Sequence, residues 1–197
     1  VWEPINPAPP VTNTVGLLLR AGYQVVVVDD LSNGDVRNIP EQATFYQVKV
    51  ESPMLSQVFE KERPEVVIHL AAQMMVSRSI SEPLLDAQVN IMGTLNVLEN
   101  CRQYGVRKIV YASSAAVYGN PHYLGIDELH PINPLSFYGI TKYTPEKYIR
   151  RYAAMYSLTY TILRYANVYG RRQGIRGEGG VIHAFANQIL SGKSPII

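Results

Sequence analysis

Three residues of this chain have the types and the spacing that could move a proton. Tyr138 and Lys142 are four positions apart in a segment with a helical pattern, so they would lie on one face, one turn apart. An ammonium near a phenol favours the phenolate and lowers the tyrosine pKa from about 10. Such a tyrosine can act as a general base near neutral pH. Ser114, upstream, could polarise the substrate oxygen whose proton Tyr138 takes.

This spacing alone is weak evidence, because the chain has 14 tyrosines and a Tyr-x-x-x-Lys match arises easily by chance. The interpretation depends on the elements that would position the residues. Continuous β-branched runs favour parallel strands buried on both faces. The expected strands are residues 24–29, 43–50, 65–70, 108–112 and 159–164. The expected helices are residues 17–21, 54–62, 84–104, 138–156 and 181–190.

Strands that alternate with helices predict a doubly wound, Rossmann-like α/β fold, with a parallel sheet and helices on both faces. In such sheets ligands bind beyond the carboxyl ends of the strands. Polar residues gather at these predicted ends: Asp29, the segment 69–73, the pair Ser113 and Ser114, and the segment 165–167. This shared placement is the strongest physical indication of a site.

Composition bounds the class of protein. The 197 residues are 17% charged and 47% hydrophobic, which is typical of a soluble globular chain. A net charge of +2 gives no indication of nucleic-acid binding. Cys101 is the single cysteine, so a cytoplasmic setting is expected. No apolar run approaches the ~20 residues of a membrane span, and the N-terminus lacks the basic and apolar regions of a signal peptide. A metal site is not expected, because no second His or Cys lies at zinc-ligand spacing from His69.

Three further stretches carry a resemblance to a known family. They are Val-Tyr-Ala-Ser-Ser-Ala-Ala-Val-Tyr-Gly at residues 110–119, Tyr-Gly-Ile-Thr-Lys at 138–142 and Leu-Arg-Tyr-Ala-Asn-Val-Tyr-Gly at 163–170. From about Leu17 onward, the chain resembles the extended short-chain dehydrogenases/reductases. Within them it is most similar to the NAD-dependent epimerase/dehydratase family, in particular to UDP-glucose 4-epimerases.

The resemblance implies roles for residues by position. Ser114, Tyr138 and Lys142 would be catalytic, and substrate would be bound by Ser114, Tyr138 and Asn167. Asp29 would bind the ribose hydroxyls of adenosine and so favour NAD over NADP. The full set implied for NAD is Asp29, Asp30, Leu70, Ala71, Ala72, Gln73, Asn90, Ser113, Tyr138, Lys142 and Tyr165.

The resemblance also implies a reaction and partners. Tyr138 would take the proton of the sugar 4-hydroxyl while hydride passes from C4 to NAD; the 4-keto sugar would turn over, and hydride would return to its other face. The substrate would be a UDP-sugar. The two long helices would form a homodimer interface.

The residues after Ser114 bear on the choice within the family. Ala115 and Ala116 stand where the 4,6-dehydratases of the family carry Asp and Glu for water elimination. Without an acid there, an epimerase is favoured over a dehydratase or a decarboxylase. The latter two remain alternatives.

The N-terminal stretch departs from the family pattern. Prolines crowd residues 4–10, and only Gly16 stands where the family has a glycine-rich turn for the NAD diphosphate. We therefore expect an irregular segment over residues 1–16 and a Rossmann-like NAD-binding domain over 17–197, with the substrate-binding part starting at about residue 170. The first strand, the glycine turn and most of the substrate lobe are expected to be missing. A second hypothesis follows, that the chain is an inactive fragment or a nucleotide-binding remnant. Arg171, Arg172 and Arg176 could contact a diphosphate or only solvent.

Overall fold

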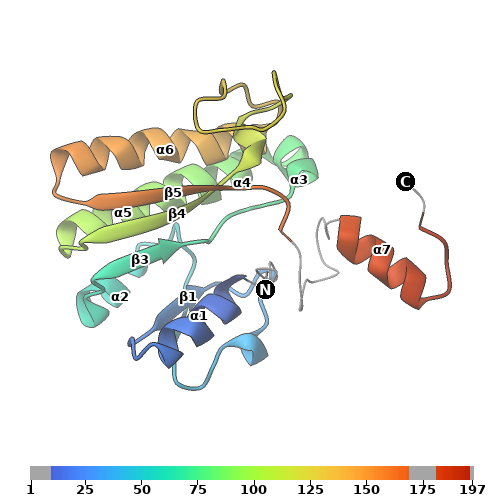
Figure 1. The fold of residues 1–197 in the computed structure, drawn as a ribbon. Helices are drawn as coiled ribbons and strands as arrows, with labels where there is room; N and C mark the ends of the chain where they lie inside the picture. Colours follow the sequence, from blue (N-terminus) through green and yellow to red (C-terminus); the bar gives the residue numbers. More distant parts are fainter. Residues whose placement is uncertain (1–9, 169–180, 196–197) are drawn as a thin grey trace. The chain divides into compact units, whose positions relative to one another are not determined.

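The computed structural model describes residues 10–168 and 181–195, and its helices and strands alternate along the chain (Figure 1). The first half contains α1 (Pro10–Arg20), β1 (Val26–Asp29), the 3-10 turn η1 (Val36–Asn38), β2 (Thr44–Gln47), α2 (Leu55–Glu62), β3 (Val66–His69) and α3 (Val76–Ser81). The remainder contains α4 (Pro83–Ala87), the π turn η2 (Gln88–Met92), α5 (Gly93–Gln103), β4 (Lys108–Ser114), the 3-10 turn η3 (Ala115–Val117), α6 (Phe137–Met155), β5 (Thr159–Tyr165) and α7 (Val181–Leu190).

The strands form two sheets, one of β1 and β2 and one in the order β3-β4-β5. In the second sheet both pairs are parallel, with His69 opposite Tyr111 and Ser114 opposite Tyr165. β4 alternates between buried and half-buried residues along its whole length. It is therefore the central strand on which this sheet is built.

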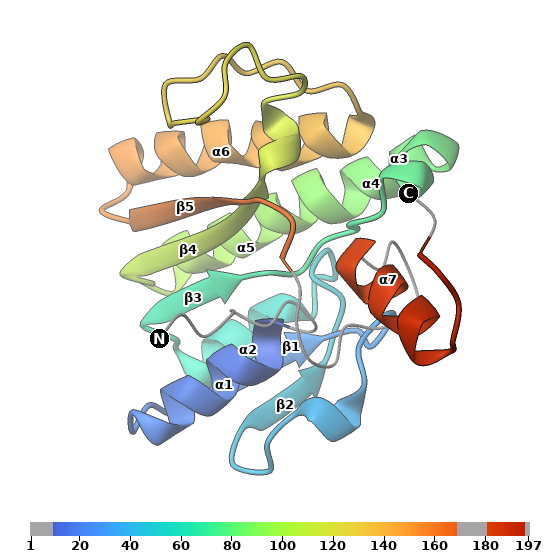
Figure 2. The ribbon, with the colours of Figure 1, turned by 45° about the vertical axis from the view of Figure 1, so that its right-hand side comes forward.

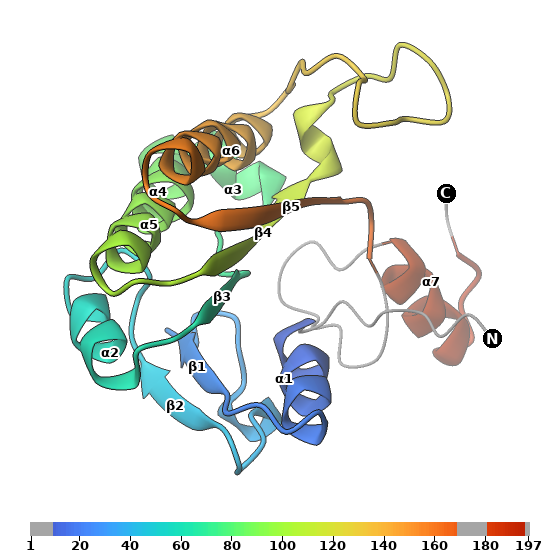
Figure 3. The same ribbon diagram turned by 60° about the vertical axis from the view of Figure 1, so that its left-hand side comes forward.

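A hydrophobic core lies between the β3-β4-β5 sheet and the helices that pack on it. Figure 3 shows α2, α5 and α6 side by side along one face of this sheet. Leu98 of α5, Ile109 of β4 and Ile149 of α6 are fully buried in this core. Burial of such side chains is the main stabilising contribution.

The helix expected over residues 84–104 is present but not uniform. α4 passes into the π turn η2 and then into α5. A π turn inserts an extra residue and widens the helix, often at a functional site. Here it contains Asn90, whose side chain is buried and contacts the segment after β3. Helical periodicity alone does not indicate this irregularity.

The N-terminal helix begins earlier than we expected. α1 starts at Pro10, so residues 10–16 are helical and the irregular segment expected over 1–16 is corrected for that part. Proline is tolerated in the first turn of a helix, where its missing N–H would have no intrahelical partner. Residues 1–9 lie outside the described residues.

The chain divides into two compact units. One contains Val28–Asp30 and Gln47–Ala166, and so includes the β3-β4-β5 sheet, α2 to α6 and the loop of residues 119–136 between η3 and α6 (Figure 2). The other comprises Val1–Val27, Leu31–Tyr46 and Asn167–Ile197. Within residues 10–168 and 181–195, no helix is long and apolar enough to cross a membrane.

Candidate active site

The sheet topology brings several predicted site residues to one edge. β3, β4 and β5 run in parallel, so their carboxyl ends meet at the same edge of the sheet. Ser113 and Ser114 end β4, and Tyr165 ends β5 directly opposite Ser114. Leu70, Ala71, Ala72 and Gln73 follow the end of β3. The expected placement at strand ends is therefore present in this sheet.

Helix α6 carries Tyr138 and Lys142 in its first two turns. Ser136 caps the helix by accepting a hydrogen bond from the Gly139 N–H at 3.0 Å. A Cβ on Gly139 would lie 2.7 Å from the carbonyl oxygen of Ala116, so only glycine allows this approach of α6 to η3. The start of α6, with Tyr138, is thereby held against the segment that follows Ser114.

Lys142 is a buried cation. Its side chain is 4% exposed, and its Nζ lies 4.9 Å from the centroid of the Tyr111 ring. Burial lowers the Lys142 pKa to about 8, and the negative charge of Asp86 opposes this shift. An ammonium with this pKa lies four residues after Tyr138 on the same helix, as the sequence predicts for a group that assists a tyrosine base.

The two serines at the end of β4 have different environments. Ser113 is buried, and its Oγ donates a hydrogen bond of 2.6 Å to Glu146 Oε1. Ser114 is half-buried, and its Oγ accepts a hydrogen bond of 3.1 Å from the Ala116 N–H. Successive side chains of a strand point to opposite faces. Ser113 thus contacts α6, and Ser114 remains the serine available to a substrate.

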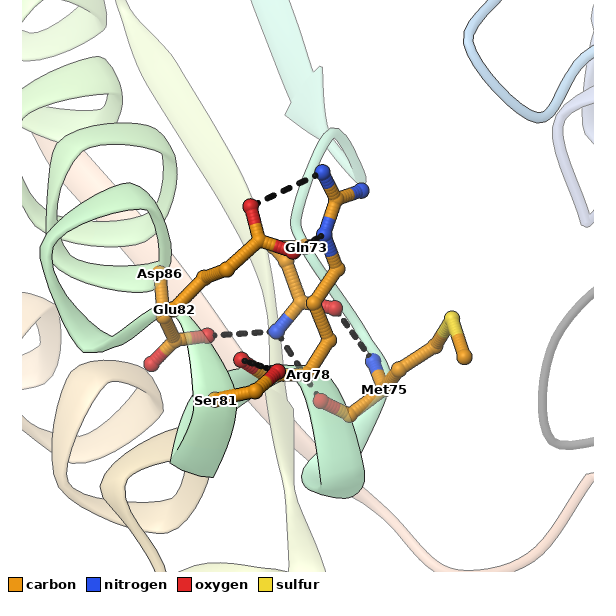
Figure 4. A network of polar contacts seen from close by, with 6 residues as sticks. All are labelled: Gln73, Met75, Arg78, Ser81, Glu82 and Asp86. Carbon is orange, nitrogen blue, oxygen red and sulfur yellow. Dashed lines mark hydrogen bonds and ion pairs between the residues drawn. The ribbon is translucent and has the colours of Figure 1, made fainter.

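A polar network joins the segment after β3 to α4, η2 and α6. The Gln73 N–H donates to Asn90 Oδ1 at 2.8 Å, and Asn90 Nδ2 donates to the Gln73 carbonyl at 3.0 Å. Gln73 Nε2 donates to Asp86 Oδ1 at 2.7 Å (Figure 4). The Thr141 hydroxyl donates to Asp86 Oδ2 at 2.7 Å. Asp86 and Thr141, which sequence reasoning missed, thus fix Gln73 and Asn90 relative to α6.

A second network missed from the sequence includes Glu146 and Arg164. Arg164 Nε and Nη2 donate to the two carboxylate oxygens of Glu146 at 2.9 and 2.7 Å. Arg164 Nη1 donates to the Tyr118 hydroxyl at 3.0 Å. The only signal in the sequence is position, because Glu146 lies one turn after Lys142 and Arg164 directly precedes Tyr165.

His69 is a packed residue at the end of its strand. Its Nε2 lies 2.9 Å from Thr94 Oγ1, and that hydroxyl donates to the Asn90 carbonyl, so the ring nitrogen is the donor. Burial, and secondarily the charge of Lys142, lowers the His69 pKa to about 3. Among the described residues, no group of three or more His, Cys, Asp or Glu side chains could hold a metal ion.

The remaining predicted residues lie at more exposed positions. Asp29 ends β1, and both Asp29 and Asp30 are half-buried. Gln47 Nε2 lies 3.5 Å from the Asp30 carbonyl. Tyr165 and Asn167 are exposed, and partial burial raises the Tyr165 pKa. Arg171, Arg172 and Arg176 lie outside the described residues.

These residues fit one part of a dinucleotide better than another. A strand-end acid such as Asp29 suits ribose hydroxyls. The buried ammonium of Lys142, one helical turn after Tyr138, suits the reactive end. In the Rossmann fold a glycine-rich turn before a helix commonly holds the diphosphate. Over residues 10–30 the glycines are Gly16, inside α1, and Gly22, which follows α1 in the left-handed region at φ 85°. This stretch does not supply such a turn.

Parallel strands, polar residues at their carboxyl ends and a helix carrying Tyr138 and Lys142 define a nucleotide-binding α/β protein of the short-chain dehydrogenase type. Residues 12–197 match the model of the NAD dependent epimerase/dehydratase family. The chain belongs to this family, whose cofactor is NAD, as the sequence predicted.

Named relatives and solved structures give the same result. A Methanocaldococcus jannaschii protein, provisionally named as a UDP-glucose 4-epimerase, is 46% identical over 94% of this chain and 61% of its own length. The UDP-glucose 4-epimerase of Thermotoga maritima, solved with UDP-glucose, is 43% identical with a TM-score of 0.89, covering 92% of this chain and 60% of that one. The Thermus thermophilus UDP-glucose 4-epimerase, solved with NAD, is 40% identical with a TM-score of 0.88 over the same shares.

Two conclusions follow from these matches. The fold is the Rossmann-like parallel α/β class that the sequence predicts. The chain spans about 60% of the length of the Methanocaldococcus jannaschii relative and of the two solved structures.

Proposed function

We propose that this chain is the NAD-binding and catalytic part of a nucleotide-sugar epimerase that inverts C4 of a UDP-sugar. The observation that supports this most is the start of α6. There Tyr138 and the buried Lys142 are one turn apart. Gly139, next to Tyr138, packs against the carbonyl of Ala116, which is two residues after Ser114. In this proposal a base and a hydroxyl act on one sugar oxygen, and a cation lies one helical turn from the base.

Each residue has a distinct task in this proposal. Tyr138 accepts the proton of the sugar 4-hydroxyl, and Ser114 Oγ hydrogen-bonds the same oxygen. Lys142 holds positive charge beside Tyr138, which favours its phenolate. NAD, when bound, supplies the hydride acceptor and donor. Asn167 and Tyr165 contact the substrate and the nicotinamide side, and Gln73 and Asn90 line the cofactor.

The 3-10 turn η3 supports epimerisation over elimination. Ala115 and Ala116 occupy this turn, directly after Ser114, and neither side chain can donate or accept a proton. Loss of water from the neighbouring sugar carbon needs an acid and a base of its own. With alanines in η3, the proton-transfer groups of this proposal serve the C4 hydroxyl alone.

The residues expected to hold NAD support one alternative to an active epimerase. In this alternative the chain carries the catalytic residues but binds NAD weakly or not at all. Residues 10–30 lack the glycine turn that would cradle the diphosphate. Asp29 and Asp30 would then contribute ribose contacts without a matching phosphate site. The Rossmann-like domain over residues 17–197 stays a prediction.

We further propose a homodimer through α5 and α6. The two helices contact each other within one chain: Arg102 of α5 lies over the ring of Tyr156, directly after α6. Glu99 of α5 accepts a hydrogen bond from the hydroxyl of Tyr152 in α6. Tyr148 and Met155 of α6 are exposed and apolar enough to pack against a second copy. A cytoplasmic location also stays a prediction.

The test is a turnover assay of the purified chain with UDP-galactose and NAD, in which UDP-glucose is measured directly. Wild type should interconvert the two sugars, and Tyr138→Phe should not. The matched control is Tyr143→Phe, which removes the same hydroxyl from the residue directly after Lys142 on α6 and should retain activity. Release of a 4-keto-6-deoxy sugar would identify a dehydratase instead. No turnover by a folded chain that binds NAD would contradict the proposal.

A further inference from the structure

Glu146 is a fully buried carboxylate that the proposed chemistry does not use. It lies in α6 and is 0% exposed. Its Oε1 accepts hydrogen bonds from Ser113 Oγ at 2.6 Å and Arg164 Nε at 2.9 Å, and its Oε2 accepts one from Arg164 Nη2 at 2.7 Å. The bidentate pairing with arginine fixes both distance and orientation.

The three members of this network come from three different elements. Ser113 is in β4, Glu146 in α6 and Arg164 in β5, and Ser113 is paired with Arg164 in the sheet register. Arg164 also holds the hydroxyl of Tyr118, directly after η3. One carboxylate thus joins both strands to the helix that packs on them.

Each member of the network is within one helical turn, along the sequence, of a residue of the candidate site. Ser113 precedes Ser114, Arg164 precedes Tyr165, and Glu146 lies one helical turn after Lys142. Because side chains alternate along a strand, the bond that holds Ser113 on α6 also fixes the direction in which Ser114 projects. The network therefore sets the geometry of the candidate-site residues that adjoin it.

Stability alone does not explain such a pair. Removing two charges from water is costly, and well-packed apolar residues often serve a fold equally well in place of a buried ion pair. What an apolar pair cannot supply is a fixed direction between three elements. A displacement of about 1 Å between reacting groups can reduce a rate by about 100-fold.

We propose that Glu146 and Arg164 are positioning residues that hold Ser114 in register with Tyr138 and Lys142. This inference rests on the proposed function, because Ser114 and Tyr138 must act on the same sugar oxygen. Glu146 and Arg164 are outside the set of residues proposed to contact the substrate or the cofactor. They form hydrogen bonds with each other, Ser113 and Tyr118. Their loss should therefore affect turnover more than binding.

The experiment compares buried and exposed ion pairs in the full 197-residue chain. Glu146→Gln keeps the size of the side chain but turns one acceptor into a donor that faces Arg164. Arg164→Lys keeps the positive charge but cannot donate two parallel hydrogen bonds to the carboxylate. The matched controls are Glu65→Gln and Arg107→Lys, which disrupt an ion pair of similar length, 2.8 Å, whose side chains are 74% and 61% exposed.

Variants of the buried pair Glu146–Arg164 should lower turnover, whereas variants of the exposed pair Glu65–Arg107 should not. For Glu146→Gln and Arg164→Lys we expect kcat for UDP-galactose to fall about 10- to 100-fold, while KM and the dissociation constant of NAD change less than about threefold. The control variants should match wild type. Unchanged kcat in Arg164→Lys, measured well below its melting temperature, would overturn the inference, as would an equal loss in the controls.

A second readout does not require activity. The Ala116 N–H donates to Ser114 Oγ, so hydrogen exchange at Ala116 reports on the position of Ser114. Exchange there should become at least about tenfold faster in Glu146→Gln and stay unchanged in Glu65→Gln. If wild type has no epimerase activity, the proposed function fails, and this exchange rate decides the inference alone. Unchanged protection of Ala116 would refute the positioning role.

Discussion

The two sheets of this chain differ in how much structure supports them. In the β3-β4-β5 sheet, β4 and β5 are seven residues long and paired throughout. β1 and β2 are four residues each and form a sheet of their own. A two-stranded sheet is at best marginally stable by itself. The residues proposed for proton transfer thus lie at the end of β4 and on α6, which packs against the better supported sheet. Asp29, in contrast, ends a strand of the weaker sheet.

The polar contacts near the two sheets differ in the same direction. Around the larger sheet, Asp86, Asn90 and Glu146 are buried and each accepts or donates several hydrogen bonds. Near β1, the bidentate contact of Arg37 with Asp35 is exposed to solvent. Buried satisfied networks make a region rigid, and exposed pairs contribute little. We therefore expect a rigid catalytic part and a cofactor part that opens readily.

The largest expected effect is on proton transfer. Tyr138→Phe keeps the ring but removes the hydroxyl, so turnover should fall by at least about 1,000-fold, which is within the usual contribution of a general base. Its melting temperature should stay close to that of wild type, because the Tyr138 side chain is only half-buried. Activity within about tenfold of wild type would exclude Tyr138 as the base.

Core truncation compares the two sheets directly. Leu98 is fully buried in the core beside β4, and Leu98→Ala should lower the free energy of unfolding by about 3–4 kcal/mol. Val27→Ala, in β1, should cost about 1 kcal/mol or less in global unfolding if the β1 region opens before the rest. Chemical denaturation measures both changes. Equal losses would mean that the two sheets unfold as one cooperative structure.

The buried ammonium should make the active site costly to fold. The folded Lys142 pKa of about 8 is below its ordinary value of 10.5, so the unfolded chain binds more protons between these pH values. The penalty is complete below pH 8 and disappears as pH rises toward 10.5. Lys142→Met should therefore abolish turnover yet stabilise the fold at pH 7 by up to about 3 kcal/mol. A gain that does not shrink between about pH 8 and pH 10 would contradict this prediction.

The smallest expected effect concerns Asp29. Asp29→Asn removes a charge that would repel a 2′-phosphate, so the preference for NAD over NADP should fall by about tenfold. The matched variant Asp30→Asn should change this ratio less, because Asp30 follows the strand end. An unchanged ratio in Asp29→Asn would remove Asp29 from the ribose site.

The sequence predicted most of the fold because its elements have strong local patterns. The β-branched run in β1, the alternation of strands and helices, and α7 at residues 181–190 all follow from periodicity and length. The family motifs likewise indicated the NAD-dependent epimerase/dehydratase family, which the comparisons confirm. Roles of individual site residues stay predictions.

The parts that were missed depend on contacts between distant residues. Ser113 and Glu146 are 33 residues apart, and Glu146 and Arg164 are 18 apart, so no local pattern relates them. The hydrogen bonds between Gln73 and Asn90, which lies in the π turn, likewise join residues that are 17 apart. The early start of α1 has a local reason, because the crowded prolines obscure the fact that one proline is acceptable in the first turn.

The most direct test of the difference between the catalytic region and the cofactor region is calorimetry of NAD binding to the purified, folded chain. NADP is measured under the same conditions. We predict saturable binding of NAD, tighter than that of NADP, because Asp29 and the Tyr138–Lys142 end of the site are in place even though residues 10–30 lack a glycine turn. A chain that melts cooperatively but releases no heat with NAD would contradict this prediction. The catalytic residues would then belong to a scaffold that cannot hold the cofactor.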